Sequence, residues 1–393
     1  MREKSINNIT EVDIQNLILN KVIENKVLEY KRDLNISKDS DKKEFLADVT
    51  SFANAGGGDI LIGVSSDNTT GEPQKLVGIA TTNIDYELQK IDQVILSGIR
   101  PKISGLQIWP IKLAEASYVI LVRIPNSWNS PHMVTLQSTN KFYTRSSNGK
   151  HLMDVDELRM SFTLSERISE KINAFRLDRI GKIFANESYL PLPALTGRVV
   201  LHIIPFSAFS NASRFDFSKV QNYQTQLRPM RAGGWDHQFN LDGFIGFSND
   251  GSYVQLFKNG IIEAVDTSIL SVYQTTAGYS IPSQKLESTV LEAFSNYLKL
   301  LYELKIEFPL VVSLSLVDIK KYSFATSGGY AALVLSRKLK SNKDVINLPE
   351  SLLQDYSMPP SVLFKPIFDC LWNAYGYQGS ENFDALGNWK PRD

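Results

Sequence analysis

Apolar and polar residues alternate over short runs near the start of the chain. Alternation from Val27 to Lys31 predicts a strand, because successive side chains of a strand point to opposite faces. A short apolar, β-branched run from Asp59 to Ser65 predicts a second strand, which the chain enters through three glycines.

Between these strands and after them, apolar residues recur at helical spacing. The spacing predicts helices over residues 10–21, 42–54 and 86–99, and further strands over 103–109 and 118–124. Thr10 and Asp13 match a capping box at the start of the first helix. Helices that alternate with strands indicate a mixed α/β layer fold.

The second half of the chain has a different pattern. Helices are expected over 154–162 and 165–184, then strands over 199–204, 241–247, 253–257 and 261–265, a helix over 287–304 and a strand over 310–317. Prolines at 191 and 193 mark a boundary. We therefore expect an α/β (α+β) chain with a mixed-sheet domain over 1–164, a helical linker over 165–195 and an α+β domain over 196–393.

Composition limits the class of protein. The chain has 393 residues, 43% hydrophobic and 10% aromatic, which is enough for two packed cores. It carries 42 basic and 42 acidic residues, so any surface that binds nucleic acid must be local. No leader or membrane span is evident and the single cysteine cannot form an internal disulfide, so a cytoplasmic protein is expected.

The strand near Val27 carries candidate chemistry. A period of two puts Glu29 and Lys31 on one face and Tyr30 on the other. If the two predicted strands pair, Asp67 at the far end of the second could approach Glu24 and Glu29. Such a cluster of oxygen ligands suits Mg²⁺ or Mn²⁺, which activates water and stabilises charge when a phosphodiester is cut.

These residues occur within a wider set of motifs that resembles the Schlafen AlbA_2 domain family. The resemblance covers roughly the first 160 residues and depends on the combination of pieces. The matching pieces are Glu24, Glu29–Lys31, Phe52–Gly58, Leu61–Val64, Leu76–Ile79, Ile99–Pro101, Pro131–His132 and Phe142–Arg145.

The resemblance implies an α/β domain and, in nuclease members of the family, a site of three carboxylates and divalent metal that cleaves transfer RNA or related RNA. Glu24 and Glu29 match the two family glutamates, and Asp67 best matches the aspartate. Many members place this acid one or two positions after Gly-Val, where this chain has Ser65 and Ser66, so Asp59 is the alternative third ligand.

The leading hypothesis is thus a metal-dependent endoribonuclease that acts on structured RNA, with transfer RNA as the expected substrate. Glu24, Glu29 and Asp67 would hold Mg²⁺ or Mn²⁺, and Lys31 would offset charge on the scissile phosphate. Family analogy alone suggests a role in anti-phage defence. A single domain offers one side of a groove, so either a homodimer or the second domain is expected to complete it.

Four further residues are candidates for RNA binding. Lys26 and Arg32 belong to a basic run that flanks the expected site, although interleaved acids leave a solvated edge as the alternative. Tyr143 and Arg145 share one face of a predicted strand, where an aromatic ring and a guanidinium suit a stacked base and its phosphate. The alternative for Arg145 is a partly buried pair with a core carboxylate.

Two other functions remain open from the sequence. The first is a nucleic-acid-binding or regulatory protein without catalysis. The second is an ATP-binding regulator that uses the loop Gly56–Gly58. No Lys-Ser or Lys-Thr follows these glycines, so the sequence lacks a Walker A motif.

Overall fold

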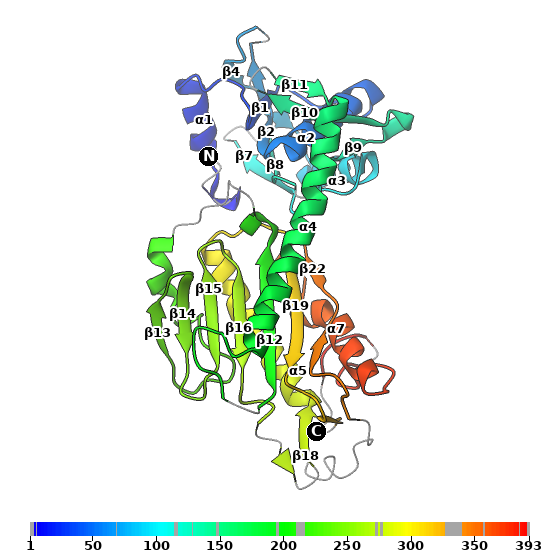
Figure 1. Ribbon diagram of the computed structural model, residues 1–393. Helices are drawn as coiled ribbons and strands as arrows, with labels where there is room; N and C mark the ends of the chain where they lie inside the picture. The colour runs from blue at the N-terminus through cyan, green and yellow to red at the C-terminus, as the bar shows by residue number, and fades with distance from the viewer. Residues whose placement is uncertain are drawn as a thin grey trace. The chain divides into compact units, whose positions relative to one another are not determined.

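The computed structural model describes residues 4, 6–67, 69–113, 117–127, 129–146, 149–193, 196–209, 217–271, 274–275, 278–326, 340–356, 358–384 and 386–390. Figure 1 shows the course of the chain. The chain divides into two compact units, Met1–Arg167 and Ile168–Asp393. Both units combine helices with mixed or antiparallel sheets, which confirms the expected α/β (α+β) class.

The first unit is built around a mixed sheet. Its strands follow the order β1-β2-β8-β5, and β7 also pairs with β8; the bounds are β1 Leu28–Lys31, β2 Gly58–Ile62, β5 Ile79–Ala80, β7 Gln107–Lys112 and β8 Ser117–Ile124. Strands β1 and β2 run parallel because helix α2, Asp39–Ala55, connects them. Among the described residues β1 pairs only with β2 in this sheet, so it is an edge strand.

Helices cover both faces of this sheet. Helices α2 and α3, the latter at Ile84–Gly98, pack against Ile60 and Ile62 of β2. Helix α1, Glu11–Leu19, belongs to the opposite face, where its Ile14 packs with Tyr30 and Leu61. The backbone N–H of Thr10 donates to Asp13 at 3.0 Å, as the capping box predicts.

Smaller elements complete the first unit. A four-stranded sheet has the order β11-β10-β9-β6, with β6 Ile99–Arg100, β9 Met133–Val134, β10 Lys141–Ser146 and β11 Gly149–Leu152. A separate hairpin pairs β3, Val64–Ser66, with β4, Pro73–Leu76. The single strand expected over 59–65 is wrong, because Gly63 has φ +109° and ends β2 before β3 begins.

Other boundaries also differ from the expectation. The strand expected from residue 103 begins only at Gln107. The two helices expected over 154–162 and 165–184 are one helix, α4, which runs from Val155 to Phe184. The division between the two units falls inside this helix.

The second unit contains a long, mostly antiparallel sheet. Its order is β13-β14-β15-β16-β12-β19-β21, and β22 also pairs with β19. The bounds are β12 Arg198–Pro205, β13 Asp236–Phe239, β14 Gly243–Phe247, β15 Tyr253–Phe257, β16 Ile262–Asp266, β19 Leu310–Val317, β21 Val345–Asn347 and β22 Ser351–Leu353. Three short strands, β17 Gln274–Thr275, β18 Gly278–Pro282 and β20 Ser323–Ala325, form a further sheet.

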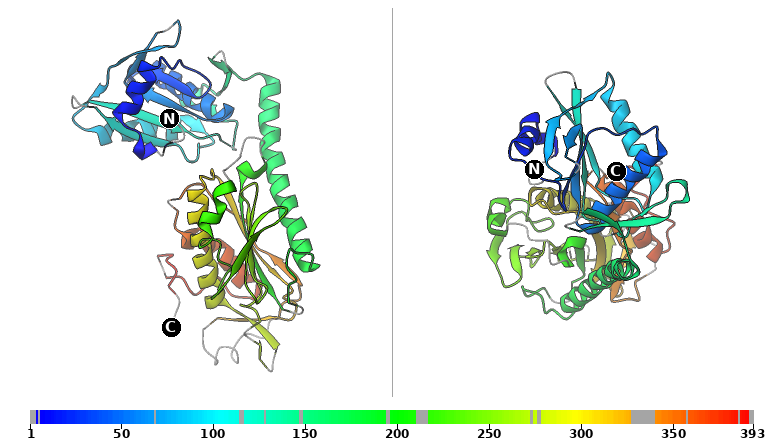
Figure 2. Two further views of the ribbon diagram at one scale, coloured as in Figure 1. Left: turned by 90° about the vertical axis from the view of Figure 1, so that its left-hand side faces the viewer. Right: turned by 90° about the horizontal axis from the view of Figure 1, so that it is seen from above.

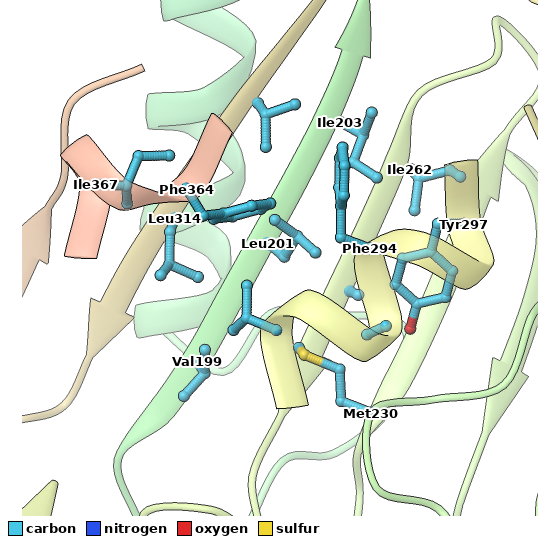
Figure 3. Packing of buried hydrophobic residues seen from close by; sticks show 14 of the residues in the cluster. Val199, Leu201, Ile203, Met230, Ile262, Phe294, Tyr297, Leu314, Phe364 and Ile367 are labelled. Atoms are coloured by element: carbon cyan, nitrogen blue, oxygen red, sulfur yellow. The ribbon is translucent and has the colours of Figure 1, made fainter. Parts of the chain in front are cut away.

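One face of the long sheet carries the main core. Val199, Leu201 and Ile203 of β12 point toward helices α5, Ser283–Glu303, and α7, Pro360–Ala374 (Figure 3). The C-terminal part of α4 covers the opposite face of the same sheet (Figure 2). No helix among the described residues is long and apolar enough to cross a membrane.

The face under α4 holds a buried polar network. Glu263 accepts hydrogen bonds from Arg179 at 2.7 and 2.8 Å and from the Tyr253 hydroxyl at 2.9 Å, and it contacts His202 at 2.9 Å. Burial opposes ionisation of Glu263, but the bonds from Arg179 and His202 outweigh it and lower its pKa to about 2. This network fixes the C-terminal part of α4 on the sheet. It also explains why His202 occurs within the apolar strand β12, since its ring contacts Glu263.

Candidate functional site at the edge of strand β1

Glu24 lies along the open edge of β1. The chain before β1 turns back on itself, since Asn25 forms a β-bridge with Leu28. The Glu24 carboxylate accepts hydrogen bonds from the backbone N–H of Tyr30 at 3.3 Å and from the Ser66 hydroxyl at 2.9 Å. The N–H of Glu24 donates to the carbonyl of Gly71 in the β3–β4 hairpin at 3.0 Å. Two neighbouring segments therefore hold this carboxylate in place.

Glu29 lies on the face of β1 that α2 covers. Its carboxylate pairs with the guanidinium of Arg145, which stacks on the ring of Phe52 at 4.1 Å from the ring centre. Burial raises the pKa of Glu29, the charges on Asp48 and Glu24 add to this rise, and Arg145 opposes it. Glu24 and Glu29 thus interact electrostatically at one edge of the sheet.

Lys31 shares this face with Glu29, as the alternation along β1 predicts. Its ammonium pairs with Asp48 of α2 at 2.6 Å, and Asp48 also pairs with Lys150 of β11 at 2.8 Å. Lys150 contacts Glu44 of α2 at 2.6 Å. Burial alone would lower the pKa of Lys31, but the pairing with Asp48 raises it. Lys31 is therefore a fixed cation beside Glu29.

These contacts form a row of alternating charges, which we call the charged row. It contains three cations and three carboxylates, in the order Arg145, Glu29, Lys31, Asp48, Lys150, Glu44. Sequence reasoning missed Asp48, which is 2% exposed. Its signal was an acid within the apolar stripe of α2, three residues after Phe45 and four before Phe52, where buried charge requires partners.

The two candidates for a third carboxylate lie elsewhere. Asp67 lies in the β3–β4 turn, where it accepts hydrogen bonds from the N–H groups of Thr69 and Thr70 at 2.8 and 2.9 Å; these bonds lower its pKa. Asp59 pairs in register with Leu28 and so lies on the face opposite to Glu29, where it forms a bidentate ion pair with Arg123 at 2.9 Å. The side chain that bonds to the Glu24 carboxylate from this hairpin is Ser66.

A divalent ion such as Mg²⁺ or Mn²⁺ needs several oxygen ligands around one point. Among the described residues no group of three or more His, Cys, Asp or Glu side chains is arranged to hold a metal. A cage of three carboxylates therefore does not fit these residues. Glu24 and Glu29 are the two expected ligands whose charges interact.

The candidates for RNA binding divide into two groups. Lys26 and Arg32 are exposed beside the edge of β1. Tyr143 and Arg145 face α2, and the Arg145 side chain is 5% exposed. The structure thus shows the alternative considered for Arg145, a buried pair with a carboxylate.

Several motif residues form the support for Arg145. The side-chain amide of Asn54 donates to the carbonyls of His132 at 3.0 Å and Tyr143 at 2.8 Å, and its oxygen accepts from the N–H of His132 at 2.7 Å. His132 is fully buried, contacts the Pro101 carbonyl at 2.7 Å, and has a pKa lowered by burial. Four motif pieces are therefore bonded into one block beneath the charged row.

The glycine loop serves backbone packing. Gly57 has φ +77°, and a Cβ there would lie 2.6 Å from the carbonyl oxygen of Ile124. A Cβ on Gly58 would collide with the ring of Phe52. Close approach of these segments accounts for the glycines without a bound phosphate.

Comparisons with known proteins agree with the motifs. The family model described as Schlafen, AlbA_2 matches residues 24–154. No curated protein matches the chain. Among solved structures, the DIP2311 protein from Corynebacterium diphtheriae is 14% identical. The match covers 37% of this chain and 27% of that protein, with a TM-score of 0.23. The chain thus spans little more than a quarter of that protein.

A second solved structure is the N-terminal domain of an ATP-dependent DNA helicase RecG-related protein from Nitrosomonas europaea. It is 21% identical, and the match covers 32% of this chain and 82% of that domain, with a TM-score of 0.25. Both TM-scores are too low to inform the fold or the function. The family match, in contrast, supports a nucleic-acid-related function. The matched region includes Glu24, Glu29 and the charged row, and the chain is a Schlafen AlbA_2 domain-containing protein.

Proposed function

We propose that this protein is a divalent-metal-dependent endoribonuclease of Schlafen type that cleaves structured RNA, with transfer RNA as its substrate. The observation that carries the proposal is the electrostatic interaction of Glu24 with Glu29 at the edge of β1, where the charge on Glu24 adds to the rise in the pKa of Glu29 caused by burial and by Asp48. Mg²⁺ is commonly bound through one or two carboxylates, with water and phosphate as its other ligands.

The chain's own groups prepare this edge for an ion and a phosphate. Ser66 and the N–H of Tyr30 orient Glu24. Lys31 adds a fixed positive charge beside Glu29. Mg²⁺ or Mn²⁺ bound here would supply an activated water and would stabilise the charge that develops on the phosphate.

Arg145 links RNA binding to the availability of Glu29. Its guanidinium now neutralises that carboxylate. A phosphate is an equally good bidentate partner for a guanidinium, so incoming RNA can draw Arg145 away from Glu29. In this proposal Arg145 contacts RNA only in the bound state, which reconciles its burial with the expected role.

The first experiment incubates the purified protein with total tRNA in Mn²⁺, Mg²⁺ or EDTA and resolves the products on a denaturing gel. We expect discrete fragments that require metal and disappear in Glu29→Gln and in Glu24→Ala/Glu29→Ala. The matched control is Asp67→Asn, which should cut like wild type because that carboxylate is occupied in its own turn. Cutting by Glu29→Gln would refute the assignment.

A second function is favoured by a specific observation. The described residues lack a three-carboxylate group, and Glu29 already has a cationic partner, as in a nucleic-acid-binding module without catalysis. This alternative predicts tRNA that stays intact in every lane, with an RNA affinity that does not depend on metal and survives loss of both glutamates.

The cellular role follows from the proposed chemistry. Loss of tRNA stops translation, so an enzyme of this kind would act in anti-phage defence through growth arrest. Cells that express the wild type should yield fewer phage than cells that express Glu29→Gln at the same level. Equal phage yields from the two strains would exclude this role.

A further inference from the structure

A polar groove lies next to the carboxyl end of β1. Its volume is about 740 Å³, and it is formed by the loop after β1 and by one side of α3. Strand β1 runs parallel to β2, and α2 connects them. In such units the space beyond the carboxyl ends of the strands is where ligands commonly bind. The groove begins two residues after Lys31 of the charged row.

The groove carries cations that a phosphate can reach. Lys42 pairs with Asp39 at 3.0 Å and Lys90 with Glu87 at 3.1 Å, each within one helix. These pairs are partly exposed to solvent and lie within one helix turn, where ion pairs contribute little, so a phosphate can replace the carboxylate. Within the charged row, in contrast, Lys31 and Lys150 are held by the nearly buried Asp48.

The remaining groups suit a nucleoside. Leu34, Ile36 and Val94 supply an apolar surface, and the Gln93 amide can bond to a base edge. Tyr86, one turn before Lys90, is 54% exposed, and the Lys90 ammonium lies 4.2 Å from its ring centre. An exposed aromatic ring beside a phosphate-binding lysine is a platform on which bases stack.

An acid in the groove indicates the kind of sugar. Asp33 lines the groove and is exposed. A carboxylate repels phosphate, but it accepts a hydrogen bond from a ribose hydroxyl, which DNA lacks at the 2′ position. The same surface therefore favours RNA over DNA.

The groove is close enough to the charged row for one RNA strand to contact both. Lys42 and Asp48 are six residues apart on α2, which is about 9 Å along a helix axis. We infer that this groove binds one ribonucleotide of a single-stranded RNA segment, with Lys42 and Lys90 on its phosphates, Asp33 on a ribose hydroxyl and the apolar surface against its base. The inference deepens the proposed function and rests on it for the identity of the ligand as substrate.

The test measures binding without cleavage. A fluorescein-labelled single-stranded oligoribonucleotide and the matching oligodeoxyribonucleotide are titrated with full-length protein in EDTA, and anisotropy gives the Kd. The double variant Lys42→Ala/Lys90→Ala should bind RNA about tenfold more weakly than wild type, and the slope of log K against log salt should fall by about 1.4 for two single-strand contacts. Asp33→Ala should weaken RNA binding about fivefold, whereas DNA binding should not weaken, because the lost carboxylate only repelled its phosphates.

A matched control separates the groove from general charge loss. Lys182→Ala/Lys365→Ala removes the same two charges from helical lysines that pair with Asp178 and Asp369 in the second unit. It should bind RNA like wild type. Equal affinity of the groove variant and this control, or no RNA binding by the wild type, would overturn the inference. If tRNA is not cut but the groove variants still lose binding, the nuclease proposal fails and the subsite stands.

Discussion

At the open edge of β1, the ionisation of each carboxylate depends on its neighbours. Asp48 pairs with two lysines and also raises the pKa of Glu29 through like charge. Asp48 is nearly buried and acts on Glu29 through its charge, so we regard it as a positioning residue. Its influence should appear in the titration of Glu29.

We predict that Asp48→Asn lowers the pKa of Glu29. In the wild type Glu29 should titrate above 4.5, the usual value for a glutamate, because burial and the Asp48 charge both favour the neutral form. A neutral residue at 48 removes one of these causes and leaves Lys31 free to stabilise the ionised carboxylate. ¹³C NMR of the glutamate carboxyl groups measures the midpoint directly.

In the proposed nuclease, the rate of tRNA cleavage should follow the same direction. The acid limb of the pH profile should move to lower pH in Asp48→Asn, because ionised Glu29 is the form that binds a cation. Asp41→Asn, which changes an acid in the first turn of the same helix, serves as the control. If wild type, Asp48→Asn and Asp41→Asn all show the same pKa for Glu29, Asp48 does not influence the ionisation of Glu29.

Asp266 in the second unit should make stability depend on pH. Burial raises its pKa from 3.8 to about 6, although Ser268 and Ile269 donate hydrogen bonds to it. The folded protein therefore holds the proton more tightly than the unfolded chain. The stability that this gives is complete below pH 3.8 and is lost as the pH rises through about 6.

Asp266→Asn keeps an acceptor for the two backbone N–H groups and removes the charge. We expect this variant to be about 2 kcal/mol more stable than wild type at pH 8, with the difference shrinking toward pH 5. Urea unfolding at several pH values measures it. A constant difference across this range would show that Asp266 is not the titrating group.

At the scale of elements, one carboxylate fastens the C-terminal tail. Glu287 of α5 is fully buried and accepts hydrogen bonds from Trp372, Ser380, Asn382 and Trp389 at 2.8 to 3.0 Å. Burial raises its pKa, and these donors oppose the rise. Helices α5 and α7 and the chain beyond residue 375 thus meet at a single side chain.

We predict that Glu287→Gln destabilises the second unit by about 3 kcal/mol, because the new amide hydrogens face donors instead of acceptors. The tail should then become sensitive to protease, and limited proteolysis with mass spectrometry would show cleavage beyond residue 375. Glu303→Gln at the exposed end of the same helix is the control. Equal protection of the tail in both variants would be incompatible with this view of Glu287.

Local patterns predicted the elements better than the site. The period of β1 correctly put Glu29 and Lys31 on one face, because alternation depends only on backbone geometry. Asp67 was a less successful prediction, since the turn residues after Ser66 bind its carboxylate locally. Asp48 and Lys150 come from segments distant in sequence, and their pairing requires the tertiary packing of β11 on α2.

At the scale of the whole molecule, the two units have separate cores. The clusters around Phe45 and Ile14 belong to the first unit, whereas those around Phe294 and Ile183 belong to the second. Separate cores commonly unfold in separate cooperative steps. Substitutions in one unit can therefore identify the step to which that unit belongs.

Differential scanning calorimetry of the full-length protein should show two transitions. Asp48→Asn should lower only one, because it leaves Lys31 and Lys150 without a buried anion, and Glu287→Gln should lower only the other. An oligoribonucleotide at 100 times its Kd, in EDTA, should then stabilise the unit whose transition Asp48→Asn lowers. The added stability should be about 2.7 kcal/mol, and the other transition should not change. A shift in the Glu287 transition instead would assign RNA binding to the second unit, and a single transition that both substitutions lower would show that the units unfold together.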